Sequence, residues 1–181
     1  QTALRMPLTL GMLLLSVGVA VGSKLGLDHQ FLRPLFITEY RSTALGLMYV
    51  PLLTELARGQ VWRLVTPIFI HFGVMHILFN MLWLLDLGRM IETRRGSFYM
   101  ALLVLSIAIP SNLAQYLAKG PGFGGMSGVV FGLIGYIWTR NKFSYRDEYP
   151  LMGNEMTLMV AWFFVCVFGL VGPVANWVHG V

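Results

Sequence analysis

The sequence is poor in charged residues and nearly free of cysteine, and each shortage narrows the class of protein. Charged residues make up only 12% of the 181 residues, whereas hydrophobic residues make up 56%. The mean hydropathy of +0.69 is far above that of an ordinary soluble domain. The single cysteine, Cys166, lies in an apolar run, so the chain forms no internal disulfide. The composition therefore indicates a membrane protein.

The net charge of +5 does not indicate nucleic-acid binding, because the basic residues are spread among loops between apolar segments. We expect no nucleic-acid partner and a lipid bilayer as the surroundings. The predicted spans are residues 6–23, 74–93, 97–118, 127–139, 156–172 and 173–181, the last of them incomplete at Val181. The sequence therefore predicts an all-α polytopic membrane protein with six transmembrane helices in a single domain, 1–181.

The connections between these spans set the expected topology. Residues 24–72 form a large first loop, predicted to lie on the outer face with short interfacial helices. Trp62 and Arg63 suit that boundary, since both side chains are amphipathic. Basic residues crowd the short loops on the opposite side, which places the N-terminus in the cytoplasm.

The fourth span is unusually short. Only 13 residues separate Ser127 from Arg140, and they cover about 20 Å of a hydrocarbon core about 30 Å thick. We therefore expect this helix to begin below the outer surface. The irregular loop before it is tolerated at that depth only where it lines an aqueous cavity.

That loop, Gly122-Phe-Gly-Gly-Met-Ser-Gly128, has two interpretations. It is either a tight turn with Ser127 as a helix N-cap, or a serine nucleophile beside unpaired helix N–H groups. The heptapeptide alone leaves both open.

The directions in which the spans cross the membrane favour the interpretation of Ser127 as a nucleophile. The second, fourth and sixth spans run in the same direction, and their early turns carry polar residues: His76, Asn80, Ser127 and His179. Polar groups at bilayer depth are costly, so they tend to face one another or a water-filled cavity. His76 and Asn80, four residues apart, share one helix face.

A stripe of small residues on the fourth span adds to this pattern. Gly128, Gly132 and Gly135 allow another helix to approach closely, and Ala175 and His179 on the sixth span are spaced to face them. Such a contact would bring His179 near Ser127. The alternative is that the stripe only packs helices.

These residues resemble the rhomboid intramembrane serine proteases of the bacterial six-span type. The resemblance covers nearly the whole chain, and the combination of motifs is specific. The motifs are Gly125-Met126-Ser127-Gly128 followed by Val-Val-Phe131, His71-Phe-Gly-Val-Met-His76-Ile-Leu-Phe-Asn80, Trp62-Arg63, Gly88 through Glu92 to Gly96, and Ala175-Asn176 before His179.

The resemblance implies a Ser-His dyad without a cofactor or a metal. Ser127 would be the nucleophile and His179 its general base. The implied oxyanion donors are His76, Asn80 and the backbone N–H groups of Ser127 and Met126, and the implied supporting residues are Gly125, Gly128 and Phe131. Phe131 stands where the family often has tyrosine, which would alter the dyad without abolishing it.

The resemblance also implies a location and a class of partner. The protein would be an integral protein of the bacterial inner membrane, with its active site opening to the outer face. Its substrates would be other transmembrane proteins, cut in or near a transmembrane helix.

Other classes of protein fit the sequence less well. His71 and His76 lack the H-E-x-x-H spacing of a zinc protease, and Asp86 is the only acid deep in a span, whereas an aspartyl protease needs two. His71 and His29 are interpreted as loop histidines. Two alternatives come from outside the enzymes: an inactive rhomboid-like protein that binds transmembrane helices, and a small transporter with a half-helix.

Overall fold

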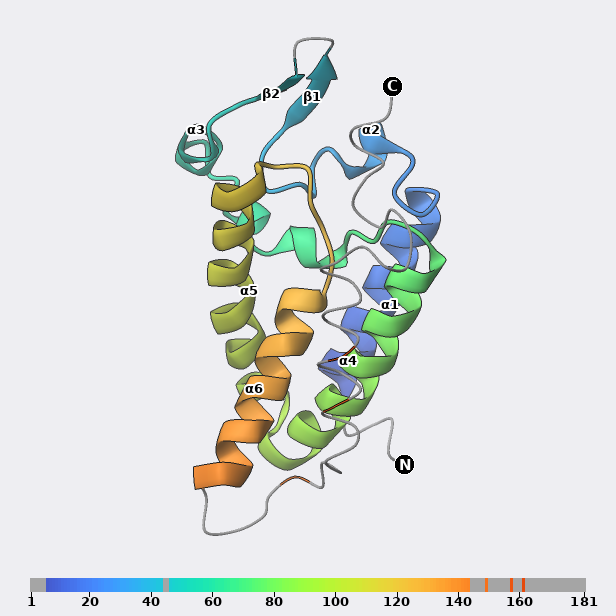
Figure 1. Cartoon of the computed structure of the whole chain (residues 1–181), viewed down its shortest axis with the longest axis vertical. Coiled ribbons are helices and arrows are strands. Elements are labelled where there is room, and N and C mark those ends of the chain that lie inside the picture. The colour runs from blue at the N-terminus through green and yellow to red at the C-terminus, as the bar shows by residue number, and fades with distance from the viewer. Residues whose placement is uncertain (1–5, 44–45, 144–148, 150–156, 158–160, 162–181) are drawn as a thin grey trace.

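The computed structural model describes residues 6–43, 46–143, 149, 157 and 161. Within these residues the chain is mostly helical, and four long helices form the body of the structure (Figure 1). They are α1 (Pro7–Gly22), α4 (Val74–Arg95), α5 (Ser97–Lys119) and α6 (Ser127–Phe143). Apart from Thr157 and Ala161, the fifth and sixth predicted spans, and His179 with them, lie outside the described residues.

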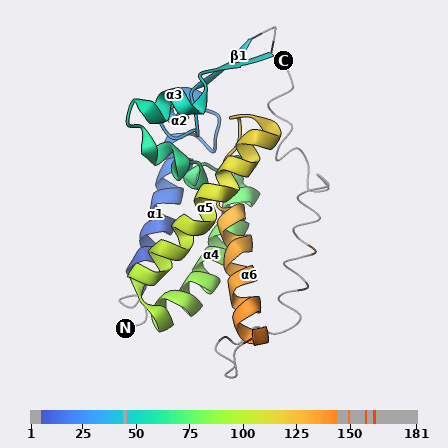
Figure 2. The same ribbon diagram turned by 90° about the vertical axis from the view of Figure 1, so that its left-hand side faces the viewer.

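The first three long helices agree closely with the predicted spans. Helices α4 and α5 are long and apolar enough to cross a membrane, whereas α1 is apolar but shorter. Figure 2 shows α1, α4, α5 and α6 lying alongside one another, and α4 contacts each of the other three. The buried core of the bundle includes Leu84, Leu87 and Ile91 of α4.

Helix α6 starts at Ser127 as predicted but continues to Phe143 instead of ending at residue 139. Its 17 residues span about 26 Å at 1.5 Å per residue. The extra turn carries Arg140 and Lys142, and basic residues are favourable at a helix C-terminus. In addition, the Lys142 ammonium lies over the Trp138 ring, 4.7 Å from its centroid. The sequence-based estimate of length was therefore too short.

The start of α6 is nevertheless set well inside the bundle. Figure 1 shows the chain leaving the C-terminal end of α5 and running back along the bundle before α6 begins. Ser127, the first residue of α6, thus lies well below that end of α5 in this view.

The first loop contains more than the predicted short helices. It holds α2 (His29–Leu32), α3 (Leu52–Ala57) and the 3-10 turns η2 (Val61–Leu64) and η3 (Thr66–Phe69). It also holds an antiparallel hairpin of β1 (Tyr40–Thr43) and β2 (Gly46–Tyr49), in which Tyr40 pairs with Tyr49. The prediction of an all-α chain is wrong here. Strands of four residues are too short for the alternation of apolar and polar residues to stand out.

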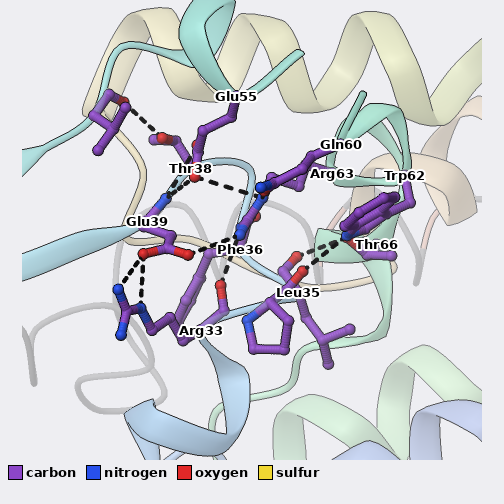
Figure 3. Close-up of polar contacts among 12 residues, drawn as sticks. Arg33, Leu35, Phe36, Thr38, Glu39, Glu55, Gln60, Trp62, Arg63 and Thr66 are labelled. Atoms are coloured by element: carbon purple, nitrogen blue, oxygen red, sulfur yellow. Dashed lines mark hydrogen bonds and ion pairs between the residues drawn. The ribbon is translucent and has the colours of Figure 1, made fainter. Parts of the chain in front are cut away.

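Arg63 holds this loop together from the inside (Figure 3). Its side chain is only 2% exposed, so it does not reach out to the interface as predicted. Its Nη1 donates to the carbonyl oxygens of Arg33 and Phe36, at 3.0 and 2.8 Å, and Nε donates to Gln60. Glu39 and Glu55 supply the negative charge. A buried guanidinium is tolerated because its donors and its charge are both satisfied.

Trp62, unlike Arg63, lies at the surface of the first loop, and its place at the membrane boundary stays a prediction. The residue is 49% exposed, and its indole N–H donates to the Pro34 carbonyl at 3.2 Å (Figure 3). The aromatic ring is therefore presented outward while its one polar atom is satisfied.

Glycines bring the long helices into close contact. A β-carbon at Gly88 would lie 2.6 Å from Thr9 of α1, and one at Gly132 would lie 2.4 Å from Ile107 of α5. At Gly128 the close neighbour is Ser111, also on α5. The predicted stripe on α6 therefore packs against α5 in the described part of the chain, where Gly135 has open space around it.

Glu92 joins three of the helices through one buried carboxylate. It accepts hydrogen bonds from the N–H groups of Leu8 and Thr9, at 2.8 and 2.7 Å, and from the hydroxyls of Thr9 and Ser97, each at 2.6 Å. The N-cap residue of α1, Met6, offers no side-chain hydrogen bond. A residue of α4 thus satisfies the unpaired donors at the start of α1.

We expect Glu92→Ala to destabilise the bundle by about 3 kcal/mol, because four buried or partly buried donors lose their acceptor. The free energy of unfolding is measured by equilibrium unfolding in mixed micelles. Asp86→Ala is the matched control, since Asp86 is an exposed acid on the same helix. Equal destabilisation by both substitutions would contradict this role for Glu92.

The glycine contacts give a second matched pair. Gly132→Ala should destabilise the protein by about 1–3 kcal/mol, because the new methyl group collides with the branched Ile107 side chain. Gly135→Ala meets no described atom within 4 Å and should be neutral or stabilising, since alanine favours the helix. Unfolding midpoints of both variants test the pair, and the reverse order would show that α5 and α6 are not packed this way.

Candidate active site

The glycine-rich segment between α5 and α6 is fixed against the chain that precedes α4. The Gly125 N–H donates to the Pro67 carbonyl of η3 at 3.0 Å. A β-carbon at Gly124 would lie 2.5 Å from Ile70, so a larger residue does not fit. Gly125 itself has φ +129°, a conformation that residues with side chains rarely adopt. These contacts explain why glycine occupies positions 124 and 125, before Ser127.

Ser127 and His76 meet at Gly125. A β-carbon on Gly125 would lie 2.7 Å from His76 Nε2 and 3.8 Å from Ser127 Oγ. The imidazole and the hydroxyl, which are far apart in sequence, therefore lie within 4 Å of a single point. The structure thus brings together two of the residues that the sequence selected.

Ser127 is the first residue of α6 and is exposed, whereas Met126 before it is completely buried. The first N–H groups of a helix have no partner within the helix and are directed toward its N-terminal end. The Ser127 hydroxyl therefore lies beside backbone N–H groups that have no partner within the helix, which makes this helix end suited to a developing negative charge.

A backbone hydrogen bond sets the orientation of His76. The Phe72 N–H donates to His76 Nδ1 at 3.3 Å, so in the neutral ring the proton is on Nε2. Nε2 is the atom that faces Gly125 and the Ser127 side. His76 therefore presents an N–H donor to the space beside the hydroxyl.

Asn80 lies one turn further along α4 and is 7% exposed. Its Nδ2 donates to the His76 carbonyl at 2.8 Å, and one further N–H of the amide remains. The shared face with His76 is as predicted. The amide nitrogen is bonded to its own helix in this structure.

His71 lies in the loop before α4, as predicted, but its burial was not predicted from the sequence. It is completely buried, its Nδ1 donates to the Phe69 carbonyl at 3.1 Å, and its ring centroid lies 5.1 Å from that of His76. Burial, with the nearby His76 as a smaller cause, lowers the pKa of His71 to about 3, so this ring stays neutral. The only sequence signal was its place in the His71-to-Asn80 motif, because its burial depends on contacts that the sequence does not display.

The remaining candidates occupy different positions. Gly128 faces Ser111, and Phe131, one turn after Ser127, packs partly buried against the core of the bundle. His179 lies outside the described residues, so the position of the general base stays a prediction. The described part places a serine hydroxyl and an imidazole N–H close together, and their roles in catalysis stay predictions.

A serine at a recessed helix terminus, facing an imidazole N–H inside an apolar helical bundle, defines a class of membrane protein. The chain belongs to the rhomboid family, because the family model of the Rhomboid domain matches residues 58–180. It is therefore a helical integral membrane protein of the polytopic type. The sequence-based resemblance to this family is confirmed.

Curated relatives agree with this assignment. The chain is 38% identical to the rhomboid protease GlpG of Salmonella paratyphi A (strain ATCC 9150 / SARB42) over 121 residues. It is 36% identical to the proteins of the same name from Yersinia pseudotuberculosis serotype I (strain IP32953) and Yersinia pestis (strain Pestoides F). Each match covers 66% of this chain and 44% of the relative, so the chain spans less than half the length of these relatives.

We expect Gly125→Ala to disrupt this site, because the new methyl group would collide with His76 Nε2 in a backbone conformation already unfavourable for alanine. The reactivity of Ser127 toward a fluorophosphonate should fall at least tenfold. Gly120→Ala is the matched control: Gly120 also has positive φ (+77°) but open space around it, so it tests backbone strain alone. Equal losses in both variants would show that the His76 contact is unimportant.

Proposed function

We propose that this protein is an intramembrane serine endopeptidase that hydrolyses a peptide bond in or near a transmembrane helix of its substrate. The juxtaposition of Ser127 Oγ with His76 Nε2 around Gly125 supports this most directly. Membership of the rhomboid family and similarity to proteins named rhomboid proteases support it independently.

The proposed reaction uses the residues as follows. Ser127 Oγ attacks the scissile carbonyl carbon, and His179 accepts the hydroxyl proton and passes it to the departing amine. The oxyanion accepts hydrogen bonds from His76 Nε2–H, from Asn80 and from the backbone N–H groups of Ser127 and Met126. Each such donor is typically worth about 10²–10³ in rate. Water then attacks the acyl-enzyme, with His179 as base, and releases Ser127.

We further propose that the dyad operates without an orienting carboxylate. Asp86 is exposed and follows His76 by ten residues, or about 15 Å along α4. Glu92 lies further still and uses its carboxylate to bind α1 and α5. Among the described residues, neither acid of α4 is placed to reach a histidine near Ser127.

The proposed topology completes the site. His179 stands on a sixth span, the N-terminus is cytoplasmic, and the site opens to the outer face of a bacterial inner membrane. The recessed start of α6 supports a site below the outer surface (Figure 1). A substrate helix must release its backbone hydrogen bonds to reach Ser127, so small or helix-breaking residues near the cleaved bond should favour cleavage.

An inactive protein that binds transmembrane helices is not favoured. Such a protein does not require an exposed serine beside a fixed imidazole donor. The chain retains both, together with Asn80 and the glycines around them.

We expect the full-length protein, reconstituted in lipid vesicles, to be labelled by a fluorophosphonate at Ser127. It should also cut a synthetic transmembrane peptide that carries an Ala-Gly pair at the outer end of a leucine-rich helix. Ser127→Ala should abolish labelling and cleavage. A peptide with Leu-Leu in place of Ala-Gly should be cut at least tenfold more slowly, because its helix unwinds less readily.

Ser106→Ala is the control variant, since Ser106 is an exposed serine on α5 whose hydroxyl donates to the Leu103 carbonyl. Its labelling and cleavage should equal those of the wild type. Equal labelling of the wild type and Ser127→Ala would refute the enzyme assignment. Equal cleavage of the two peptides would refute the unwinding requirement alone.

A further inference from the structure

Three side chains from different parts of the chain lie along the glycine-rich segment, each at a different glycine. Tyr40 of β1 lies at Gly122, Ile70 lies at Gly124, and His76 of α4 lies at Gly125, next to Ser127. The middle residue is apolar, and the two outer ones carry hydrogen-bonding groups. The segment therefore has the proposed oxyanion donor at one end and a tyrosine hydroxyl at the other.

The Tyr40 side chain is held firmly. Its ring packs edge-on against Phe36, with centroids 4.8 Å apart, and against His29 at 6.1 Å. The hydroxyl oxygen lies 3.6 Å from the position of a β-carbon on Gly122. Tyr40 precedes residues 58–180, so the family match assigns it no role.

The hydroxyl of Tyr40 is buried and has no hydrogen-bond partner among the described residues. Burial raises the pKa of Tyr40 to about 12, so the group remains protonated and acts as a donor. An unsatisfied buried hydroxyl is destabilising, whereas phenylalanine would fill the same space without that penalty. A buried donor of this kind calls for an acceptor that arrives from elsewhere.

We propose that the Tyr40 hydroxyl donates a hydrogen bond to a backbone carbonyl of the substrate as it lies along Gly122–Gly125. This inference rests on the proposed protease function. A substrate segment that has lost its helical hydrogen bonds presents carbonyl oxygens that need donors. Because residue 122 has no side chain, a small shift of its backbone uncovers the hydroxyl.

The spacing limits which carbonyl is bound. Three residue steps, from Gly122 to Gly125, measure at most about 10 Å, at 3.3 Å per residue of extended chain. With the scissile carbonyl beside His76, the carbonyl at Tyr40 belongs to a residue two to four positions away. Tyr40 would thus bind the substrate at a point remote from the bond that is cut.

Tyr40→Phe tests this proposal, since it removes one oxygen atom and preserves the ring contacts. The probes are the fluorogenic Ala-Gly transmembrane peptide and a small fluorophosphonate, both with the full-length protein in vesicles. We expect kcat/KM for the peptide to fall about threefold to tenfold, as for the loss of one neutral hydrogen bond. The rate of fluorophosphonate labelling should not change, because that probe reaches only the surroundings of Ser127. The unfolding midpoint should stay the same or rise.

Tyr49→Phe is the matched control, because Tyr49 pairs with Tyr40 across the hairpin but packs edge-on against Tyr116. It should cleave the peptide like the wild type. If Tyr40→Phe cleaved the peptide at the wild-type rate, the proposal would be overturned. A parallel loss of labelling and cleavage would also overturn it, because Tyr40 would then only position the loop. A wild-type protein that is not labelled at all would instead refute the protease function itself.

Discussion

The close packing of a glycine backbone against larger side chains is the constraint on which this structure depends. Ile70 occupies the space beside Gly124, and His76 occupies the space beside Gly125. A side chain at either glycine would push the segment away from α4 and carry the start of α6 with it. Ser127 would then lose its position beside the imidazole. The site therefore depends on the lack of a side chain at Gly124 and Gly125 as much as on the polar groups themselves.

Two buried charged side chains fix the first loop and the helices that surround the site. Arg63 binds the carbonyls and carboxylates of the first loop, and Glu92 binds α1 and α5 to α4. A buried charge left unpaired is strongly unfavourable, so each of these groups permits only those arrangements that satisfy it. In an apolar bundle, where hydrophobic packing is weakly directional, such groups specify which surfaces meet.

Sequence patterns predicted the long elements because their signals are local. Largely apolar runs marked α1, α4 and α5, and the glycine-rich turn marked the start of α6 at Ser127. The features that were missed depend on distant partners. The burial of His71, the inward direction of Arg63 and the packing of Gly132 against α5 all arise from contacts between separate segments. The meeting of His76 with Ser127 was predictable because both stand in early turns of spans with the same direction.

The stretch from η3 to the start of α4 links the first loop to the candidate site. Pro67 accepts the Gly125 N–H, Ile70 packs against Gly124, and the Phe72 N–H sets the proton of His76 on Nε2. These contacts lie within a few residues of one another, so a displacement of this stretch would move the loop before Ser127 and change the direction of the imidazole donor together. Asn112 of α5 adds a fixed point by donating to the Leu64 carbonyl of η2. The first loop and Ser127 therefore form one mechanical unit, although only the later part of that unit carries the residues of the candidate site.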